Sequence, residues 1–125
     1  MSPTLSIELP AKATSPRAAR QAVAAQLDGY PRAPELLLCV SEVVTNAVLH
    51  AHSAVRLAMT EAGSHVRVEV YDDDPTLPVQ RHPEPSTPTG RGLLLLDELS
   101  TGWGAAPSGS GKVVWFTFDL EDGPA

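Results

Sequence analysis

Alternating apolar and polar residues mark several short segments of the chain. The clearest alternation, with a period of two, occurs in residues 4–9, 55–60, 66–70 and 113–120. That period is typical of strands that bury one face and expose the other. The segment 101–105 is a weaker candidate, which would pair with the last strand through a turn at 107–111. The sequence Glu61-Ala62-Gly63-Ser64 predicts a hairpin turn between the second and third strands.

Three other segments show the spacing of three and four residues that is typical of amphipathic helices. We expect helices over residues 16–27, 34–52 and 93–99. Ser15 and Pro16 suit the N-cap and the first helical position of the first helix. The second helix should be largely buried, because its apolar stripe is wide and includes Leu36, Val40, Val43, Ala47 and Ala51.

The segment 74–89, between the third strand and the third helix, has no periodicity and is rich in proline. A loop of this length within a compact domain is usually a lid, a binding loop or a disordered segment. The predicted order is therefore strand, helix, helix, strand, strand, loop, helix, strand, strand. Antiparallel strand pairs with helices on one side indicate an α+β fold built as a two-layer sandwich.

The composition fits one domain, residues 1–125, and excludes several classes of function. A hydrophobic fraction of 42% with 19% charged residues is typical of a globular chain. The net charge of −6 argues against non-specific binding to nucleic acid or to an anionic membrane. The single cysteine, Cys39, excludes an internal disulfide and reads as a small apolar core residue. No apolar run is as long as a membrane span, and the N-terminus does not resemble a signal peptide, so we expect a cytoplasmic protein.

A polar strip crosses the apolar face of the second predicted helix. Glu42, Asn46 and His50 are spaced four residues apart and therefore lie along one side of the helix. One interpretation is a hydrogen-bonded pair inside the core, since an unpartnered polar group is costly to bury. The other is a pocket, in which Glu42 orients or deprotonates a hydroxyl or a water and the Asn46 carbonyl oxygen binds Mg²⁺.

Three acidic residues, Asp72, Asp73 and Asp74, follow the third predicted strand. They are either solvated turn residues or include one acceptor for an exocyclic amine. A carboxylate only accepts hydrogen bonds, so such a contact would favour adenine over guanine. A trio of metal-binding carboxylates is a third interpretation.

The segment Thr89-Gly90-Arg91-Gly92-Leu93 stands at the start of the third predicted helix. Glycines let a backbone approach a ligand closely, and the amides at a helix N-terminus bind anions such as phosphates. Arg91 either adds a cation to such a site or points into solvent. A Gly-x-Gly before a helix is also an ordinary turn, so this segment alone does not decide between the two.

Taken in order, these features resemble the nucleotide-binding domain of the GHKL superfamily, which includes gyrase and the histidine kinases. The likeness is greater to the small anti-sigma-factor serine/threonine kinases and to histidine-kinase-like ATPases of actinobacterial type. It rests on Ser41-Glu42-Val43-Val44-Thr45-Asn46-Ala47, Gly90-Arg91-Gly92-Leu93 and Gly111-Lys112-Val113-Val114-Trp115-Phe116. The resemblance covers residues 5–119 and implies a Bergerat fold, with a mixed, mostly antiparallel sheet and helices on one face.

The resemblance also implies ATP and Mg²⁺ as cofactors and assigns roles on the second helix and the strand that follows. Glu42 matches the acidic residue that activates the attacking nucleophile. Asn46 matches the residue that coordinates Mg²⁺, and Asp72 matches the residue that binds the adenine amino group. These three residues would form the catalytic, metal and base contacts of an ATP site.

Further roles follow for the second half of the chain. The segment Gly90, Arg91, Gly92 and Leu93 matches the one beside the phosphates, and residues 74–89 take the place of the ATP lid. Gly111 matches a glycine at the start of the last strand, near the adenine. All of these positions would contact or cover the nucleotide.

The chain departs from the family pattern after the third strand. The family's adenine motif reads Asp-x-Gly-x-Gly, whereas this chain reads Asp72-Asp73-Asp74-Pro75-Thr76 and has neither glycine. We expect the backbone there to approach a nucleotide less closely. Asp73 and Asp74 remain alternatives to Asp72 as the residue that binds the adenine amine.

The function implied by the resemblance is transfer of the ATP γ-phosphoryl group to a serine or threonine of a protein partner. The implied partner is an anti-sigma-factor antagonist, with a sigma factor as a second partner, and a homodimer is a further expectation. Two alternatives stay open: a non-catalytic module that sequesters a regulatory protein, and a plain ATP hydrolase. The missing glycines favour the module, whereas Glu42 and Asn46 favour an enzyme.

Overall fold

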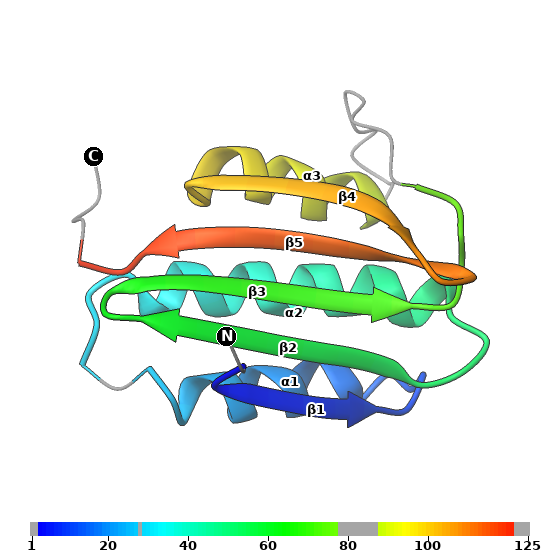
Figure 1. Cartoon of the computed structure of the whole chain (residues 1–125), viewed down its shortest axis with the longest axis horizontal. Coiled ribbons are helices and arrows are strands. Elements are labelled where there is room, and N and C mark those ends of the chain that lie inside the picture. The colour runs from blue at the N-terminus through cyan, green and yellow to red at the C-terminus, as the bar shows by residue number, and fades with distance from the viewer. Residues whose placement is uncertain (1–2, 28, 78–87, 122–125) are drawn as a thin grey trace.

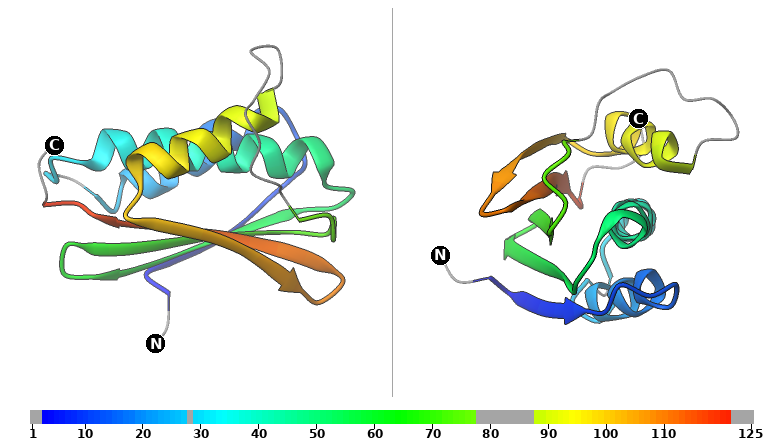
Figure 2. Two further views of the ribbon diagram at one scale, coloured as in Figure 1. Left: turned by 90° about the horizontal axis from the view of Figure 1, so that it is seen from above. Right: turned by 90° about the vertical axis from the view of Figure 1, so that its right-hand side faces the viewer.

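The computed structural model describes residues 3–27, 29–77 and 88–121, and its strands form a single five-stranded sheet. In chain order the elements are β1 (Leu5–Leu9), α1 (Ser15–Ala24), α2 (Ala33–His50), β2 (Val55–Ala62), β3 (His65–Asp72), α3 (Pro88–Leu99), β4 (Gly102–Ser108) and β5 (Gly111–Asp119). The strand order is β1-β2-β3-β5-β4, and each of these pairings is antiparallel. All three helices cover one face of the sheet, which confirms the two-layer α+β sandwich (Figure 1, Figure 2).

The period-two pattern of the sequence places the apolar side chains of the strands against the helices. In β3, Val66, Val68 and Val70 are buried, and in β5 Phe116 and Phe118 pack edge to face on the same side. The apolar stripe of α2 is buried against them, as its spacing predicts. Within the described residues, no helix combines the length and the apolar character that crossing a bilayer requires.

Several element ends differ from those expected from the sequence. Ser15 is the first residue of α1, and its hydroxyl donates a hydrogen bond to the Pro10 carbonyl instead of capping the helix. α3 begins at Pro88, five residues before the expected start at 93, because the fixed φ of proline suits the first helical position even where glycines follow. β4 continues through Pro107, which a strand at the edge of a sheet tolerates.

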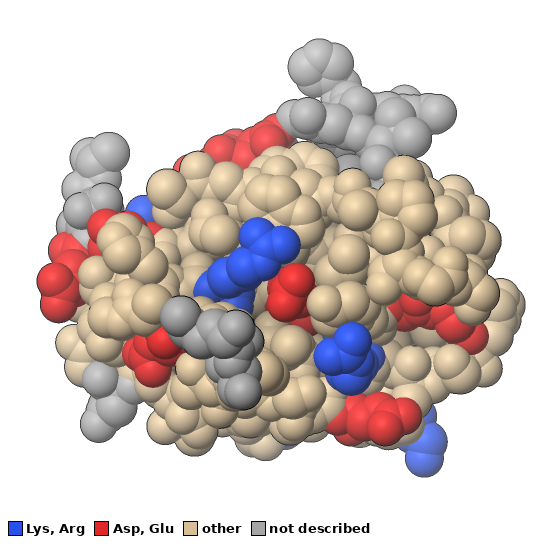
Figure 3. All heavy atoms as spheres, viewed as in Figure 1, with Lys and Arg blue, Asp and Glu red and all other residues tan. Residues whose placement is uncertain are grey.

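The face of the sheet turned away from the helices carries scattered basic and acidic side chains (Figure 3). Two arginines of the strands stack on aromatic rings. The guanidinium carbon of Arg56 lies 3.9 Å from the centroid of the Tyr71 ring, and that of Arg67 lies 4.4 Å from the Trp115 ring. Gly104 makes room for Trp115, since a Cβ there would lie 2.6 Å from the indole. Stacking of this kind contributes about 0.5–1 kcal/mol each at exposed sites.

Arg32, the residue directly before α2, fastens the C-terminal end of α3. Its Nη2 donates a hydrogen bond to the Leu99 carbonyl oxygen over 2.7 Å. Its guanidinium carbon also lies 5.2 Å from the centroid of the Phe118 ring. The last carbonyls of a helix have no partner within the helix, and a cation is favourable there. Arg32 therefore joins the start of α2, the end of α3 and the end of β5.

We expect Arg32→Ala to lower the free energy of unfolding by about 1–3 kcal/mol, the usual contribution of a hydrogen bond from a charged donor. Arg20→Ala is the matched control, because Arg20 is exposed and its Nη1 is 3.4 Å from the Ser41 hydroxyl. The control should change stability by less than about 0.5 kcal/mol. Urea unfolding measures both, and equal losses would show that Arg32 does not fasten α3.

Candidate functional site

The predicted site residues lie at one end of the two-layer sandwich, where four elements meet. The C-terminal half of α2, the end of β3, the start of β5 and the start of α3 share this end (Figure 1, Figure 2). Antiparallel pairing of β3 with β5 sets the last residue of one strand beside the first residues of the other. Segments that are far apart in the sequence therefore come together here.

Glu42 and Asn46 lie on α2, and both side chains are half-buried. Their helical neighbours Val43 and Ala47 are only 4% and 5% exposed, whereas the two polar residues keep intermediate exposure, with the Asn46 Oδ1 atom itself buried. Their roles in catalysis and in metal binding remain predictions.

Burial changes the chemistry of Cys39, one turn before Glu42 on α2. Removal from water raises the pKa of the thiol to about 12, with the Arg32 charge opposing that rise and the Glu42 charge adding to it. The thiol is therefore neutral at physiological pH and packs as an apolar residue, as the sequence predicts.

Asp72, the last residue of β3, forms a buried ion pair with Lys112 of β5. The Lys112 Nζ lies 3.1 Å from Asp72 Oδ1, and the two side chains are 8% and 1% exposed. The two residues stand directly opposite one another in the β3–β5 register, on the side of the sheet that faces the helices. The Lys112 ammonium also donates to the Asp74 carbonyl oxygen over 3.1 Å. No local sequence pattern singles out Lys112.

The acidic segment after Asp72 is shaped by successive side-chain-to-backbone turns. The Asp74 amide donates to Asp72 Oδ1 and the Thr76 amide donates to Asp74 Oδ1, each over 2.9 Å. Among the described residues, φ is positive only at Gly29, Gly63 and Gly109, so no residue from 72 to 77 adopts a left-handed conformation. The absent family glycines therefore cause no backbone strain here.

The other two acidic residues point to different partners. The His52 amide donates to Asp73 Oδ1 over 2.8 Å, and this hydrogen bond is the main reason that the pKa of Asp73 is lowered. The backbone hydrogen bond from Thr76 lowers the pKa of Asp74, to which the Lys112 charge adds. Both carboxylates are thus ionised at neutral pH. In the described part of the chain, no group of three or more His, Cys, Asp or Glu could hold a metal ion, so the carboxylate-trio interpretation is wrong.

Gly111 allows β5 to begin in direct contact with the backbone of β3. A Cβ at this position would lie 1.9 Å from the Asp72 carbonyl oxygen and 2.7 Å from the Asp73 Cα. Only glycine fits this approach without movement of the backbone. Gly111 therefore lies beside Asp72, the candidate base-binding aspartate, and its contact with a nucleotide stays a prediction.

The segment that the sequence predicts to bind phosphates, residues 89–93, lies inside α3 and not before it. Because α3 begins at Pro88, residues 90–93 occupy its first two turns, and the amides of Thr89 and Gly90 have no acceptor within the helix. Such amides are anion-binding groups. The side chains of Arg91 and Leu93, and residues 78–87 of the predicted lid, lie outside the described residues.

The chemistry of the groups at this end fits ATP with Mg²⁺. Mg²⁺ usually takes one or two protein oxygen ligands and completes its shell with water and phosphate oxygens. The Asn46 amide on the half-buried strip would supply such a ligand, and no dedicated protein cage is needed. Asp72 has remaining acceptor capacity, since a carboxylate offers about four acceptor positions.

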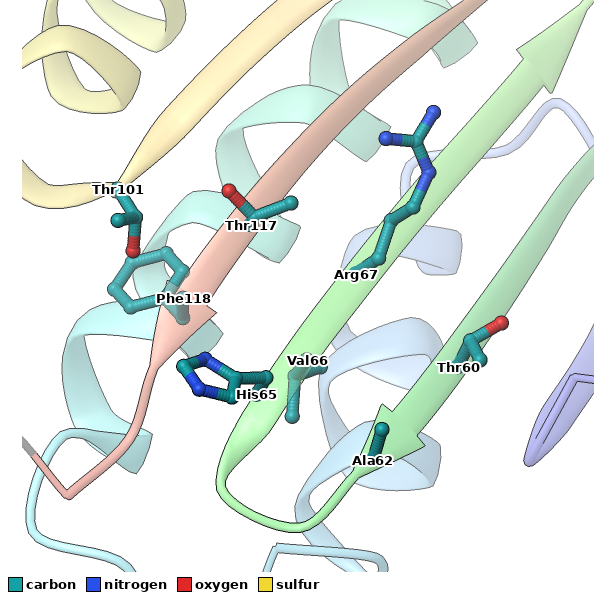
Figure 4. A pocket seen from close by; sticks show the side chains of 8 residues that line it. All are labelled: Thr60, Ala62, His65, Val66, Arg67, Thr101, Thr117 and Phe118. Atoms are coloured by element: carbon teal, nitrogen blue, oxygen red, sulfur yellow. The ribbon is translucent and has the colours of Figure 1, made fainter.

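A hollow of about 500 Å³ lies elsewhere, at the end of the sheet near the β2–β3 hairpin (Figure 4). Its lining includes Thr60, His65, Arg67 and Thr117. None of the predicted site residues contributes to it. The candidate site is therefore separate from this hollow.

Comparison with known proteins identifies a family and a fold. The family model of the histidine kinase-like ATPase domain matches residues 9–118. The RsbU and RsbW domains of Rv1364c from Mycobacterium tuberculosis are similar in structure, with a TM-score of 0.68 and 21% identity over 93% of this chain. The histidine kinase domain of the blue-light activated histidine kinase EL346 from Erythrobacter litoralis is also similar in structure. Its TM-score is 0.55, and the two are 28% identical over 72% of this chain. No curated protein matches the chain.

The chain spans only part of these solved structures. It covers 31% of the Rv1364c chain and 45% of the kinase-domain chain. A longer structure of the same Erythrobacter kinase has the same TM-score and identity, and the chain covers 31% of it. The likeness therefore concerns one domain of each larger protein.

We expect Gly111→Ala to lower the free energy of unfolding by about 1–3 kcal/mol or more, because β5 must shift away from Asp72. Gly102→Ala is the control, since a Cβ there would meet the Thr117 hydroxyl at 3.6 Å, an ordinary contact. Urea unfolding of both variants measures the difference. A Gly111 variant as stable as the Gly102 variant would contradict the close approach.

Proposed function

The chain belongs to the histidine kinase-like ATPase domain family, and on that premise we propose that it is an ATP-dependent kinase of a serine or threonine in a regulatory protein. Membership in this family supports ATP binding and the general class of kinase or ATPase. The finer assignment rests on one observation, the half-buried strip of α2 that presents Glu42 and Asn46 at the end of the fold where Asp72 and the start of α3 also lie.

Each group has a defined task in the proposed reaction. Asp72 receives the amine of adenine, and the first amides of α3 bind phosphate oxygens. Mg²⁺, when bound, neutralises charge on the phosphates, and Asn46 would hold it. Glu42 accepts the proton of the substrate hydroxyl. The hydroxyl oxygen bonds to the γ-phosphorus while the bond between the γ-phosphorus and ADP breaks. Phosphoryl transfer requires positioning and charge neutralisation, and these residues supply both.

The proposed partner is a regulatory protein such as an anti-sigma-factor antagonist, with a sigma factor as a second partner. The fold likeness to the RsbW-containing structure supports this class of partner. A homodimer and a cytoplasmic location belong to the same proposal. Residues 74–89 would form the lid over the nucleotide.

A second candidate function is a non-catalytic module that binds a regulatory protein without using ATP. The Asp72–Lys112 ion pair favours it, because the carboxylate proposed to receive adenine already accepts from Lys112 and from the Asp74 amide. A plain ATP hydrolase uses the same groups as the kinase, with water in place of the hydroxyl. Nucleotide titration separates the module from the two enzymes.

We expect Asn46→Ala to weaken ATP binding about tenfold or more in the presence of Mg²⁺ and to leave it unchanged without the metal, since loss of a metal ligand or its support typically costs 10–100-fold. Isothermal titration calorimetry with and without Mg²⁺ measures this. Leu49→Ala, an exposed position on the same helix, is the control. An equal loss in both conditions would reject the metal role of Asn46.

We expect Glu42→Gln to retain ATP binding and to lose turnover by about 10²–10⁴-fold, the usual contribution of a general base. Phosphate release and phosphoryl transfer to serine- and threonine-containing peptides measure turnover, and calorimetry measures binding. Glu98→Gln on the exposed face of α3 is the matched control. Full turnover in the Glu42 variant would assign the proton transfer to another group.

A further inference from the structure

Asp72 and Lys112 are the only charged side chains that are buried among the residues the structure describes. The rest of the buried set is apolar except for Ser15. A buried ion pair is weak evidence for stability, since apolar residues of similar volume often serve equally well. The position of the pair, at the end of the sandwich that holds the candidate site, points to another use.

The bonds of Lys112 leave it able to contact a ligand. An ammonium has three N–H donors. Two of them are directed to Asp72 Oδ1 and to the Asp74 carbonyl oxygen, each at 3.1 Å. One donor remains without an acceptor in the described residues, and it stands beside the carboxylate that is proposed to receive the base.

The surroundings hold this ammonium in place. Lys112 stands opposite Asp72 in the last pair of the β3–β5 ladder. Gly111 permits the close approach of the two strands there. The turn that carries the Asp74 carbonyl is itself fixed by the Asp74 amide bond to Asp72. Donor and acceptor are therefore presented side by side on one rigid support.

We infer that Lys112 is a specificity-determining residue of the nucleotide site, which makes the site accept purines with a 6-carbonyl group as well as adenine. This inference rests on the proposed function, since it requires that Asp72 face the base. A lone carboxylate accepts an adenine amine but repels a carbonyl oxygen at the same position. With Lys112 beside it, a 6-carbonyl has a donor, and the adjacent ring N–H has the carboxylate.

Adenine also finds two partners at this pair. Its amine donates to Asp72, and its ring nitrogen N1 accepts from Lys112. The two kinds of purine edge carry donor and acceptor in opposite order, so a 6-carbonyl purine meets the lysine–aspartate pair with its ring turned over relative to adenine. The discrimination against a 6-carbonyl purine is then smaller than a solitary aspartate would give.

Calorimetric titration with ATP and inosine triphosphate tests the inference, because the two bases differ only at position 6 and the adjacent ring nitrogen. We expect the wild-type protein to bind the two within about tenfold of each other. Lys112→Met should weaken both nucleotides and should increase the preference for ATP by about tenfold or more, because the carboxylate then stands alone and repels the 6-carbonyl. Lys112→Arg keeps charge and donors and should keep the wild-type ratio, and Lys12→Met is the matched control at an exposed lysine.

The outcomes are distinguishable. Wild-type protein that rejects inosine triphosphate more than a hundredfold, or a ratio unchanged in Lys112→Met, overturns the inference and leaves the kinase proposal intact. Wild-type protein that binds neither nucleotide overturns the proposed function and this inference with it. Circular dichroism checks the fold of each variant, and if Lys112→Met does not fold, the wild-type ratio alone decides.

Discussion

The backbone contact between Gly111 and Asp72 determines where the charged groups of the candidate site stand. Because glycine has no Cβ, β5 begins against the end of β3, and the next residue along β5 falls opposite Asp72. This register buries an aspartate and a lysine together. The turn that follows Asp72, the ion pair and the start of β5 all depend on this one approach of two strands.

The fold was largely predictable, because hydrophobic periodicity reports which face of each element is buried. The strand segments and the buried stripe of α2 appear where their periods place them. The element ends were less predictable, because local competition decides them. The Ser15 hydroxyl donates to Pro10 rather than capping α1, and Pro88 starts α3 ahead of two glycines that propensity alone would leave in a loop.

The candidate site was predictable only in part. The spacing of Glu42 and Asn46 places them on one strip of α2. Lys112 has no such local pattern, because its importance depends on Asp72, the residue opposite it on β3. The β3–β5 register that pairs the two residues is not set by a hairpin, because α3 and β4 lie between these strands in the chain. The expectation that the glycine-free segment after Asp72 stands further from a nucleotide stays a prediction. The structure adds that its aspartates close regular turns without strain.

The helix α3 is held unequally along its length. Its C-terminal half is tied by Arg32 to the Leu99 carbonyl and by the Trp103 indole to the Asp97 carboxylate, whereas its first two turns contain two glycines. Each glycine in a helix costs about 1 kcal/mol relative to alanine. Unwinding the first two turns of α3 would therefore cost little free energy, and the C-terminal half would stay packed on the sheet. This glycine-containing end of α3 is the one that we propose binds the phosphates.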